Sequence, residues 1–347
     1  MMKLIRARAP LRLGLAGGGT DVSPYCDEYG GAILNATIGL YAYATIEPLT
    51  VPVVSFQSFD RNQQAEYEST GALPMDGPLD LLKTIHNYAV QHFNGGKPLN
   101  LRVVTRVDVP SGSGLGGSST LVVAVLKAYS ELLNTPLDDY TLAHVAYVIE
   151  REEAGLQGGK QDQFAAAFGG VNFMEFGREG HVLVNPLRIK ESVLAELEAS
   201  LLLFFTGASR ESKEIIAEQA RNVEQNNEDA VEAMHQLKKE AFLMKESLLR
   251  GDFQKLHQIM LRSWEAKKRM AKQIVNEQIE TAYAKALDAG AYCAKISGAG
   301  GGGFMIFLTD PMRKERVAQA LGELDSCGTI YRCHFATAGA MVWKADA

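Results

Sequence analysis

The segment Pro110-Ser-Gly-Ser-Gly-Leu-Gly-Gly-Ser-Ser119 separates a run of β-forming residues, 99–109, from an apolar segment with helical character, 120–133. A glycine-rich turn from a strand into a helix presents backbone amides at the helix N-terminus, and these attract phosphate groups. A flexible turn with a serine N-cap is the simpler alternative, but so many glycines and serines favour phosphate binding. The candidate residues of such a phosphate-binding turn are Pro110, Gly112, Gly114, Leu115, Gly116, Gly117, Ser118 and Ser119.

The same segment also matches a dinucleotide-binding pattern. Gly-x-Gly-x-x-Gly occurs at 112–117 and again at 298–303. The dinucleotide fold needs a second strand that ends in an acidic residue about twenty positions later. Here a second predicted helix follows the first match, and a strand follows the other match. The Walker A pattern GxxxxGK[S/T] is absent. A dinucleotide-dependent oxidoreductase is therefore the weaker hypothesis, and NADH binding without ATP binding would support it.

Two further glycine clusters suggest close backbone contacts. Gly17, Gly18 and Gly19 follow a predicted strand and precede Thr20 and Asp21. Three glycines allow the backbone to approach a ligand, and a tight turn with the aspartate as a helix cap is an equal alternative. In the second cluster, five of the six residues from 298 to 303 are glycine. A hairpin needs one or two, so this excess predicts backbone packed against a ligand or another loop.

One aspartate has surroundings that could support catalysis. Asp162 follows Gly158-Gly159-Lys160-Gln161. A carboxylate near positive charge can accept a proton, although from this segment by itself an ordinary helix-start carboxylate is the favoured interpretation. Glu150, Glu152 and Glu153 lie upstream on a predicted helix. One of them could ligate magnesium, whereas solvated glutamates are the usual case.

Composition excludes several classes of protein. The chain has 347 residues, 46% of them apolar and 22% charged, with a formal net charge of −6. A nucleic-acid binder usually carries a basic face, and no apolar run has the length of a membrane span. The four cysteines have neither CxxC spacing nor a zinc-like cluster, as expected for free thiols in the cytoplasm. We therefore expect a cytoplasmic protein that binds a small molecule rather than nucleic acid or a membrane, and the oligomeric state stays open.

Apolar periodicity predicts an ordered chain of strands and helices. Residues 210–250 are predicted to form two helices rather than one, because Asn226-Asn227-Glu228-Asp229 can cap a new helix. Further helices are expected at 78–94, 137–154, 252–262, 264–289 and 311–324. The predicted strands cover 3–9, 11–16, 32–47, 51–59, 99–109, 201–206, 292–296, 303–309 and 329–336.

Residues 9–21, 110–119 and 295–303, taken in order, resemble the three motifs of the GHMP kinases. This superfamily includes galactokinase, homoserine kinase, mevalonate kinase and phosphomevalonate kinase. The resemblance implies an α+β fold of two domains, an N-terminal domain of the ribosomal-protein-S5-like type and a ferredoxin-like C-terminal domain with added helices. The predicted domains are 1–190, which would bind ATP, and 191–347. It also implies ATP-dependent phosphoryl transfer with Mg²⁺ to an alcohol group.

The same resemblance implies roles for particular residues. Asp162 aligns with the catalytic aspartate, and Arg12 occupies the position of an active-site arginine or lysine. Ser118 aligns with the serine that meets magnesium, and Glu150 is the best match to the magnesium-ligating glutamate, with Glu153 as the alternative. The residues expected to contact the substrate are Gly17, Gly18, Gly19, Thr20, Asp21, Lys160, Gly298, Gly300 and Gly301.

Residues 16–21 and 158–163 are most similar to the heptose 7-phosphate kinase branch of the superfamily. Fucokinase-type domains are near relatives. This branch would make a 1,7-bisphosphate, a precursor of nucleotide-activated heptose for surface glycans. Galactokinases have Glu-His where this chain has Gly18-Gly19, which argues against galactose and leaves room for a bulkier or phosphorylated sugar. The alternatives are another sugar 1-kinase, such as a fucokinase, and a non-catalytic sensor that binds ATP and sugar.

Overall fold

A long antiparallel strand pair forms the centre of the N-terminal sheet. The computed structural model describes residues 3–207, 213–324 and 328–346. β1 and β2 pair over most of their length, with register shifts after Pro10 and after Gly14, and the first residues of β2 also pair with β6. The sheet order is β12-β1-β2-β5-β3-β4, and β7 pairs with β6. The strands are β1 (Lys3–Ala16), β2 (Gly31–Pro48), β3 (Val53–Ser58), β4 (Gln63–Glu68), β5 (Leu101–Val107), β6 (Val171–Phe176), β7 (Val182–Pro186) and β12 (Met341–Asp346).

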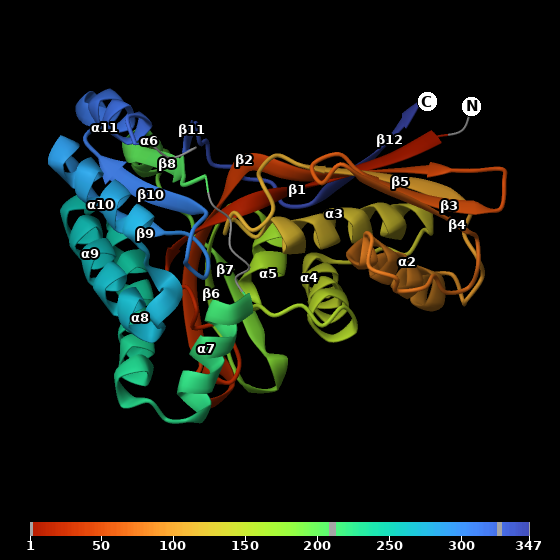
Figure 1. Cartoon of the computed structure of the whole chain (residues 1–347), viewed down its shortest axis with the longest axis horizontal. Helices are drawn as coiled ribbons and strands as arrows, with labels where there is room; N and C mark the ends of the chain where they lie inside the picture. Colours follow the sequence, from red (N-terminus) through yellow and green to blue (C-terminus); the bar gives the residue numbers. More distant parts are fainter. Residues whose placement is uncertain (1–2, 208–212, 325–327, 347) are drawn as a thin grey trace.

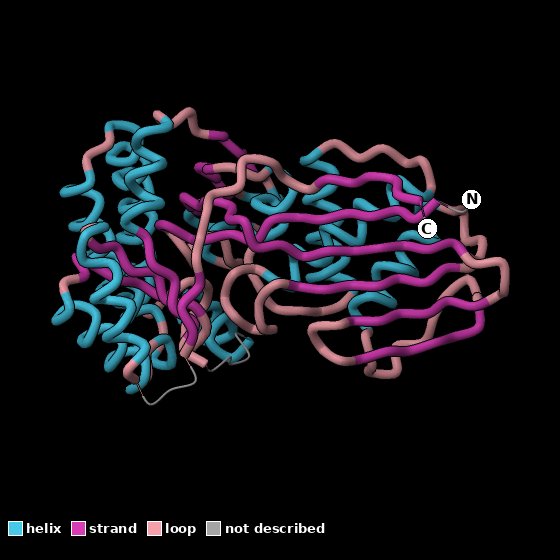
Figure 2. Tube along the Cα trace, turned by 90° about the horizontal axis from the view of Figure 1, so that it is seen from above, coloured by secondary structure: helices cyan, strands magenta, loops and turns pink. Residues whose placement is uncertain are grey.

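Helices of the N-terminal part lie against one face of this sheet (Figures 1 and 2). The central helix, α3, is almost wholly buried and packs on β1 and β2. Its unbroken apolar stretch, residues 121–126, explains this position, because a helix that is apolar on every side must be covered on every side. The helical elements of this part are α1 (Tyr25–Tyr29), α2 (Asp80–Phe93), α3 (Gly117–Leu132), α4 (Asp139–Tyr147), the π-helical turn η1 (Val148–Glu153), α5 (Gln161–Phe168) and the short turn η2 (Arg178–Gly180).

The C-terminal part is a smaller antiparallel sheet beside a helical layer (Figure 1). Its strand order is β11-β8-β10-β9. Side chains of Asn227, Asp252 and Asn276 cap the starts of α8, α9 and α10. The elements are α6 (Glu191–Ser200), β8 (Leu201–Phe205), α7 (Lys213–Glu224), α8 (Glu228–Arg250), α9 (Phe253–Met270), η3 (Lys272–Ile274), α10 (Glu277–Ala289), β9 (Ala291–Ile296), β10 (Phe304–Thr309), η4 (Pro311–Arg313), α11 (Lys314–Gly322) and β11 (Thr329–Tyr331).

The predicted two-part mixed fold is confirmed, and so is the helix break at Asn227, where the side chain accepts a hydrogen bond from Ala230 N. The predicted break at residue 263 is wrong. No glycine or proline interrupts the stretch there, so α9 runs on to Met270.

The domain division after residue 190 stays a prediction. One strand crosses it, since β12 pairs with β1 at the edge of the N-terminal sheet.

A shared apolar core joins the two parts. It brings together Leu13 of β1, Met244 of α8 and Ile306 of β10, all buried. Cys26 and Cys293 are buried free thiols and Cys333 is a half-buried one, while Cys327 lies outside the described residues. Within the described ranges, no helix is long and apolar enough to cross a membrane.

Candidate active site

A cavity of about 520 Å³ lies where the two parts meet. The glycine clusters at 17–19, 111–119 and 298–299 all reach it, although they are far apart in the sequence. Helices α7 and α9 of the C-terminal part form the opposite wall. The lining side chains that carry charge are Arg12, Asp21, Arg61, Glu150, Arg151, Asp162, Lys213, Lys267 and Lys295.

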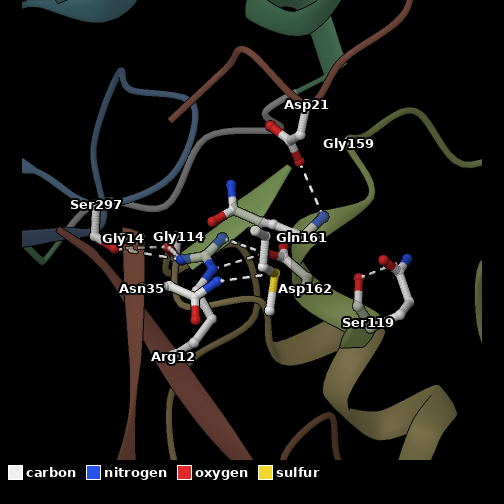
Figure 3. Close-up of polar contacts among 12 residues, drawn as sticks. Arg12, Gly14, Asp21, Asn35, Gly114, Ser119, Gly159, Gln161, Asp162 and Ser297 are labelled. Atoms are coloured by element: carbon white, nitrogen blue, oxygen red, sulfur yellow. Dashed lines mark hydrogen bonds and ion pairs between the residues drawn. The ribbon is translucent and has the colours of Figure 1, made fainter. Parts of the chain in front are cut away.

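Arg12 and Asp162 form the central ion pair of this cavity (Figure 3). The Arg12 guanidinium contacts Asp162 Oδ1 through both Nε and an Nη atom, each at 2.6 Å. Its other Nη donates to Gly114 O at 2.7 Å, so one buried side chain joins β1, the 111–119 loop and the start of α5. Asp162 keeps 18% of its side chain exposed. A carboxylate that is held in place and still reaches solvent can accept a proton from a bound molecule.

The 111–119 loop presents the N-terminus of α3 to the cavity. Gly116 occupies the cap position with a positive φ of 77°, and no side chain of a described residue caps the helix. The simpler interpretation, a serine N-cap, therefore does not apply. The first amides of α3 lack intrahelical partners, and their partial positive charge lies beside Ser118 and Ser119, which line the cavity. Pro110 and Leu115 do not line the cavity, and Leu115 is fully buried beneath the loop.

The glycines after Lys295 are explained mainly by contact with the 111–119 loop. A Cβ on Gly114 would overlap Ser297 O, and a Cβ on Gly303 would overlap Ser113 O. Phe304 N donates to Ser113 O at 2.9 Å, which fixes the two loops against each other. Gly298 lines the cavity. The structure does not bring Gly300 and Gly301 to it, because they pack against Ile274, whose carbonyl accepts from Gly301 N at 2.8 Å.

The 17–19 loop forms a second wall beside the ion pair. A Cβ on Gly17 would overlap Ala32 O, whereas the Cα of Gly18 faces open space. Thr20 does not line the cavity: it is buried, and its Oγ1 accepts from Ala32 N at 3.1 Å and thereby holds the loop. Asp21 lines the cavity and accepts from Gln161 N at 3.0 Å, at the start of α5 (Figure 3). Burial, and secondarily the charge of Asp162, raise the pKa of the Asp21 carboxyl.

The structure separates the two candidate magnesium ligands. Glu150 lines the cavity and is 1% exposed, whereas Glu153 is exposed and does not line it. Gln163 Nε2 donates to Glu150 Oε2 at 2.7 Å, and an Arg151 Nη lies 3.4 Å from Oε1. Arg151 also donates to Ser119 Oγ at 3.3 Å. The carboxylate is thus fixed beside the serines of the 111–119 loop.

Lys160, which was predicted to contact the substrate, lies outside the cavity. Its ammonium pairs with Asp27 Oδ1 at 3.2 Å and lies 3.6 Å from Cys26 Sγ, and it does not line the cavity. Two other lysines, which were not predicted from the sequence, line the cavity. Lys267 Nζ donates to Gly18 O at 3.1 Å, and Lys295 Nζ donates to Gly14 O at 2.6 Å. Burial lowers their pKa values, to about 8 for Lys267 and about 7 for Lys295.

Two family models match this chain. The GHMP kinases N-terminal domain matches residues 80–170, which include the 111–119 loop and Asp162. The GHMP kinases C-terminal model matches residues 244–326, which include α9 and the loop after Lys295.

Individual relatives agree with these models. The chain is 49% identical over 343 residues to D-glycero-alpha-D-manno-heptose 7-phosphate kinase of Campylobacter jejuni, covering 99% of this chain and 100% of the relative. A crystal structure described as a D-glycero-D-manno-heptose 1-phosphate kinase from Bacteroides thetaiotaomicron has a TM-score of 0.84 and 42% identity, covering 99% of this chain and 100% of that one. L-fucokinase/L-fucose-1-P guanylyltransferase of Bacteroides fragilis is 26% identical, over 92% of this chain and 36% of the relative. The cavity, both family models and these relatives together establish that the chain belongs to the GHMP kinases, which are ATP-dependent phosphotransferases.

Proposed function

We propose that this enzyme transfers the γ-phosphoryl group of ATP to the anomeric O1 hydroxyl of D-glycero-D-manno-heptose 7-phosphate, and that it acts in the cytoplasm. The observation that carries the proposal is the Arg12–Asp162 pair, which lines the same cavity as the 111–119 loop and the 17–19 loop. The product would be the 1,7-bisphosphate. Free thiols at all three described cysteines suit a reducing compartment.

ATP would place its phosphates on the 111–119 loop. The uncapped first turn of α3 offers amide donors and the positive end of the helix dipole. Ser118, Ser119 and Arg151 line the same part of the cavity and add donors for phosphate oxygens. This arrangement neutralises charge around a transferring phosphoryl group, which is the main task of a protein in this chemistry.

The residues around Glu150 fit a magnesium ion. Mg²⁺ prefers oxygen ligands and is usually held by one or two carboxylates together with substrate phosphates. Glu150 supplies a buried carboxylate whose orientation Gln163 fixes, and the Ser118 hydroxyl lines the same cavity. When bound, the ion would neutralise charge on the ATP phosphates.

Asp162 would act as the general base. The sugar oxygen attacks the γ-phosphorus, the bond from that phosphorus to the bridging oxygen of ADP breaks, and the hydroxyl proton passes to the Asp162 carboxylate. Arg12 holds this carboxylate from two nitrogen atoms and its charge is buried. Arg12 therefore orients the base and stabilises the negative charge that develops between donor and acceptor.

The acceptor side of the cavity has room for a large sugar. Gly18 and Gly19 carry no side chains, and the Cα of Gly18 faces open space. Lys267 contributes positive charge there. The names of two relatives reported above place the substrate's phosphate differently, one at position 7 and one at position 1. A phosphate already at O1 would leave that oxygen unable to accept another, so we assign the substrate as the 7-phosphate.

A coupled ADP-release assay with Mg-ATP tests the proposal. The acceptors are heptose 7-phosphate, mannose, fucose, galactose, N-acetylhexosamines, homoserine and mevalonate. Selective turnover of heptose 7-phosphate is the expected result. Preferential turnover of fucose or another sugar would overturn the substrate assignment and leave the kinase. ATP binding without turnover of any acceptor would favour a non-catalytic sensor.

A further inference from the structure

Two buried polar groups on the α7–α9 wall of the cavity lack a hydrogen-bond partner in the described part of the chain. Gln219 of α7 is 2% exposed and Ser263 of α9 is 1% exposed. Neither Gln219 Nε2 nor Ser263 Oγ has a hydrogen-bond partner among the described residues, and both residues line the cavity. Buried donors in native proteins are almost always paired. Two unpaired donors on residues that line one cavity therefore indicate a bound group that supplies acceptors.

A buried cation completes this wall. Lys267 lies one helical turn after Ser263 on α9, so the two side chains share a face of the helix. Its ammonium has three donors, and the hydrogen bond to Gly18 O uses one of them. Among the described residues, no carboxylate lies within ion-pair distance of Lys267. The charge of Asp21 offsets only part of the cost of burying this ammonium, so an anion is the expected partner.

The position of this cluster assigns it to the acceptor rather than to ATP. A Cβ built on Gly19 would lie 3.3 Å from Lys267 Nζ and 3.5 Å from Gln219 Oε1. The cluster thus faces the 17–19 loop. The 111–119 loop instead contacts the Arg12–Asp162 pair, through Gly114 and Gly116. An anion bound at Lys267 would be separated from the ATP phosphates by the reacting centre.

We propose that Lys267, Ser263 and Gln219 form the subsite for the phosphate group that the acceptor sugar already carries. This inference rests on the proposed function, since it requires a phosphorylated acceptor. An ammonium, a hydroxyl and an amide together match the several acceptor oxygens of one phosphate monoester. The subsite would hold the distant end of the sugar and so orient its O1 hydroxyl toward Asp162.

The test compares Lys267→Met and Ser263→Ala with the wild-type enzyme in steady-state kinetics. Loss of a hydrogen bond to a charged group typically changes binding by about 10- to 150-fold, so Lys267→Met should raise KM for heptose 7-phosphate by that factor. KM for ATP, and KM for the same heptose without phosphate, should stay within about twofold. Ser263→Ala should show a smaller effect of the same kind. Lys268→Met is the matched control, because Lys268 is the next residue on α9 and pairs with Glu265 outside the cavity.

The outcomes separate this inference from the proposed function. An equal rise in KM for the phosphorylated and unphosphorylated heptose, in both variants, would mean that these residues support the 17–19 loop and do not bind phosphate. Thermal unfolding of each variant checks that the fold persists. If Lys267→Met does not fold, Ser263→Ala still tests the subsite, because it removes only one oxygen atom. Failure of the proposed function would appear earlier, as wild-type enzyme that does not turn over heptose 7-phosphate, and the subsite assignment would then be wrong as well.

Discussion

Arg12 contacts Asp162 Oδ1 from two nitrogen atoms at 2.6 Å, although 150 residues separate them in the sequence. The contact joins β1 of the N-terminal sheet to the first turn of α5. Gly116 makes it possible, because Asp162 Cγ lies 3.0 Å from where a Cβ at that position would be. The pair therefore fixes the base relative to the loop that would bind ATP.

Replacing the base should abolish most turnover and leave ATP binding intact. We expect Asp162→Asn to lower kcat by about 10²- to 10⁴-fold, the usual contribution of a general base. Kd for ATP, measured by calorimetry, should change little, because asparagine is nearly the size of aspartate and keeps the packing against Gly116 of the 111–119 loop. Asp139→Asn on the exposed start of α4 is the control and should keep full activity. Near-normal kcat in Asp162→Asn would remove this residue from the reaction.

The two glutamates near the cavity should differ in their effect on the metal requirement. Glu150→Gln should raise the Mg²⁺ concentration for half-maximal activity by at least about tenfold, because a buried oxygen ligand loses its charge. Glu153→Gln, three residues later and exposed, is the matched control. Activity is measured against free Mg²⁺ at saturating ATP. The reverse pattern would assign the metal to Glu153.

The contact between the 111–119 loop and the loop after Lys295 should not tolerate a methyl group. Gly114 has a φ of 81°, and a Cβ there would overlap Ser297 O. Gly114→Ala should lower the free energy of unfolding by more than about 1 kcal/mol and weaken ATP binding. Gly180→Ala is the control, because Gly180 has a φ of 73° and no heavy atom within 4 Å of its Cβ position. Equal losses of stability in the two variants would show that the loop contact adds nothing beyond backbone strain.

Lys295 should make stability depend on pH. Burial, and secondarily the charge of Lys267, lower the pKa of the Lys295 ammonium to about 7 from the ordinary 10.5. Between these values the unfolded chain holds a proton that the folded protein has released, so the free energy of unfolding rises as pH increases through this window. This stabilisation is complete above the unfolded pKa and is lost as pH falls through the folded pKa.

Denaturant titrations of the wild type and of Lys295→Met measure this effect. The free energy of unfolding of the wild type minus that of the variant should rise by up to about 1.4 kcal/mol per pH unit between pH 7.5 and 9. Lys97→Met, at an exposed site, should show no such rise. A flat difference for Lys295→Met would mean that the ammonium keeps an ordinary pKa in the folded protein.

The sequence predicted the parts of this site that depend on local patterns. Glycine-rich turns between strands and helices are visible within about ten residues, so the 17–19 and 111–119 loops were identified, and both reach the cavity. Lys267 could not be identified. It lies in Lys267-Lys268-Arg269, the last turn of α9, where cations commonly interact with the helix dipole. Only the packing of α9 against the 17–19 loop distinguishes Lys267, which is buried, from Lys268, which pairs with Glu265.

Long-range pairing limited the fold prediction in the same way. β12 was not predicted, because its burial alternates weakly and its partner, β1, lies more than 300 residues earlier in the chain. Lys160 was misjudged for a related reason. Its neighbours in the sequence suggested a ligand contact, but Asp27, from α1, takes up its charge.

The most direct test of the central claim identifies the product of the wild-type reaction. Heptose 7-phosphate and Mg-ATP are incubated with the enzyme, and the mixture is followed by phosphorus NMR with proton correlation. We predict ADP together with a new phosphate ester coupled to the anomeric proton, while the ester at position 7 persists. A new phosphate on any other carbon, or ATP hydrolysis without a new sugar ester, would contradict the account.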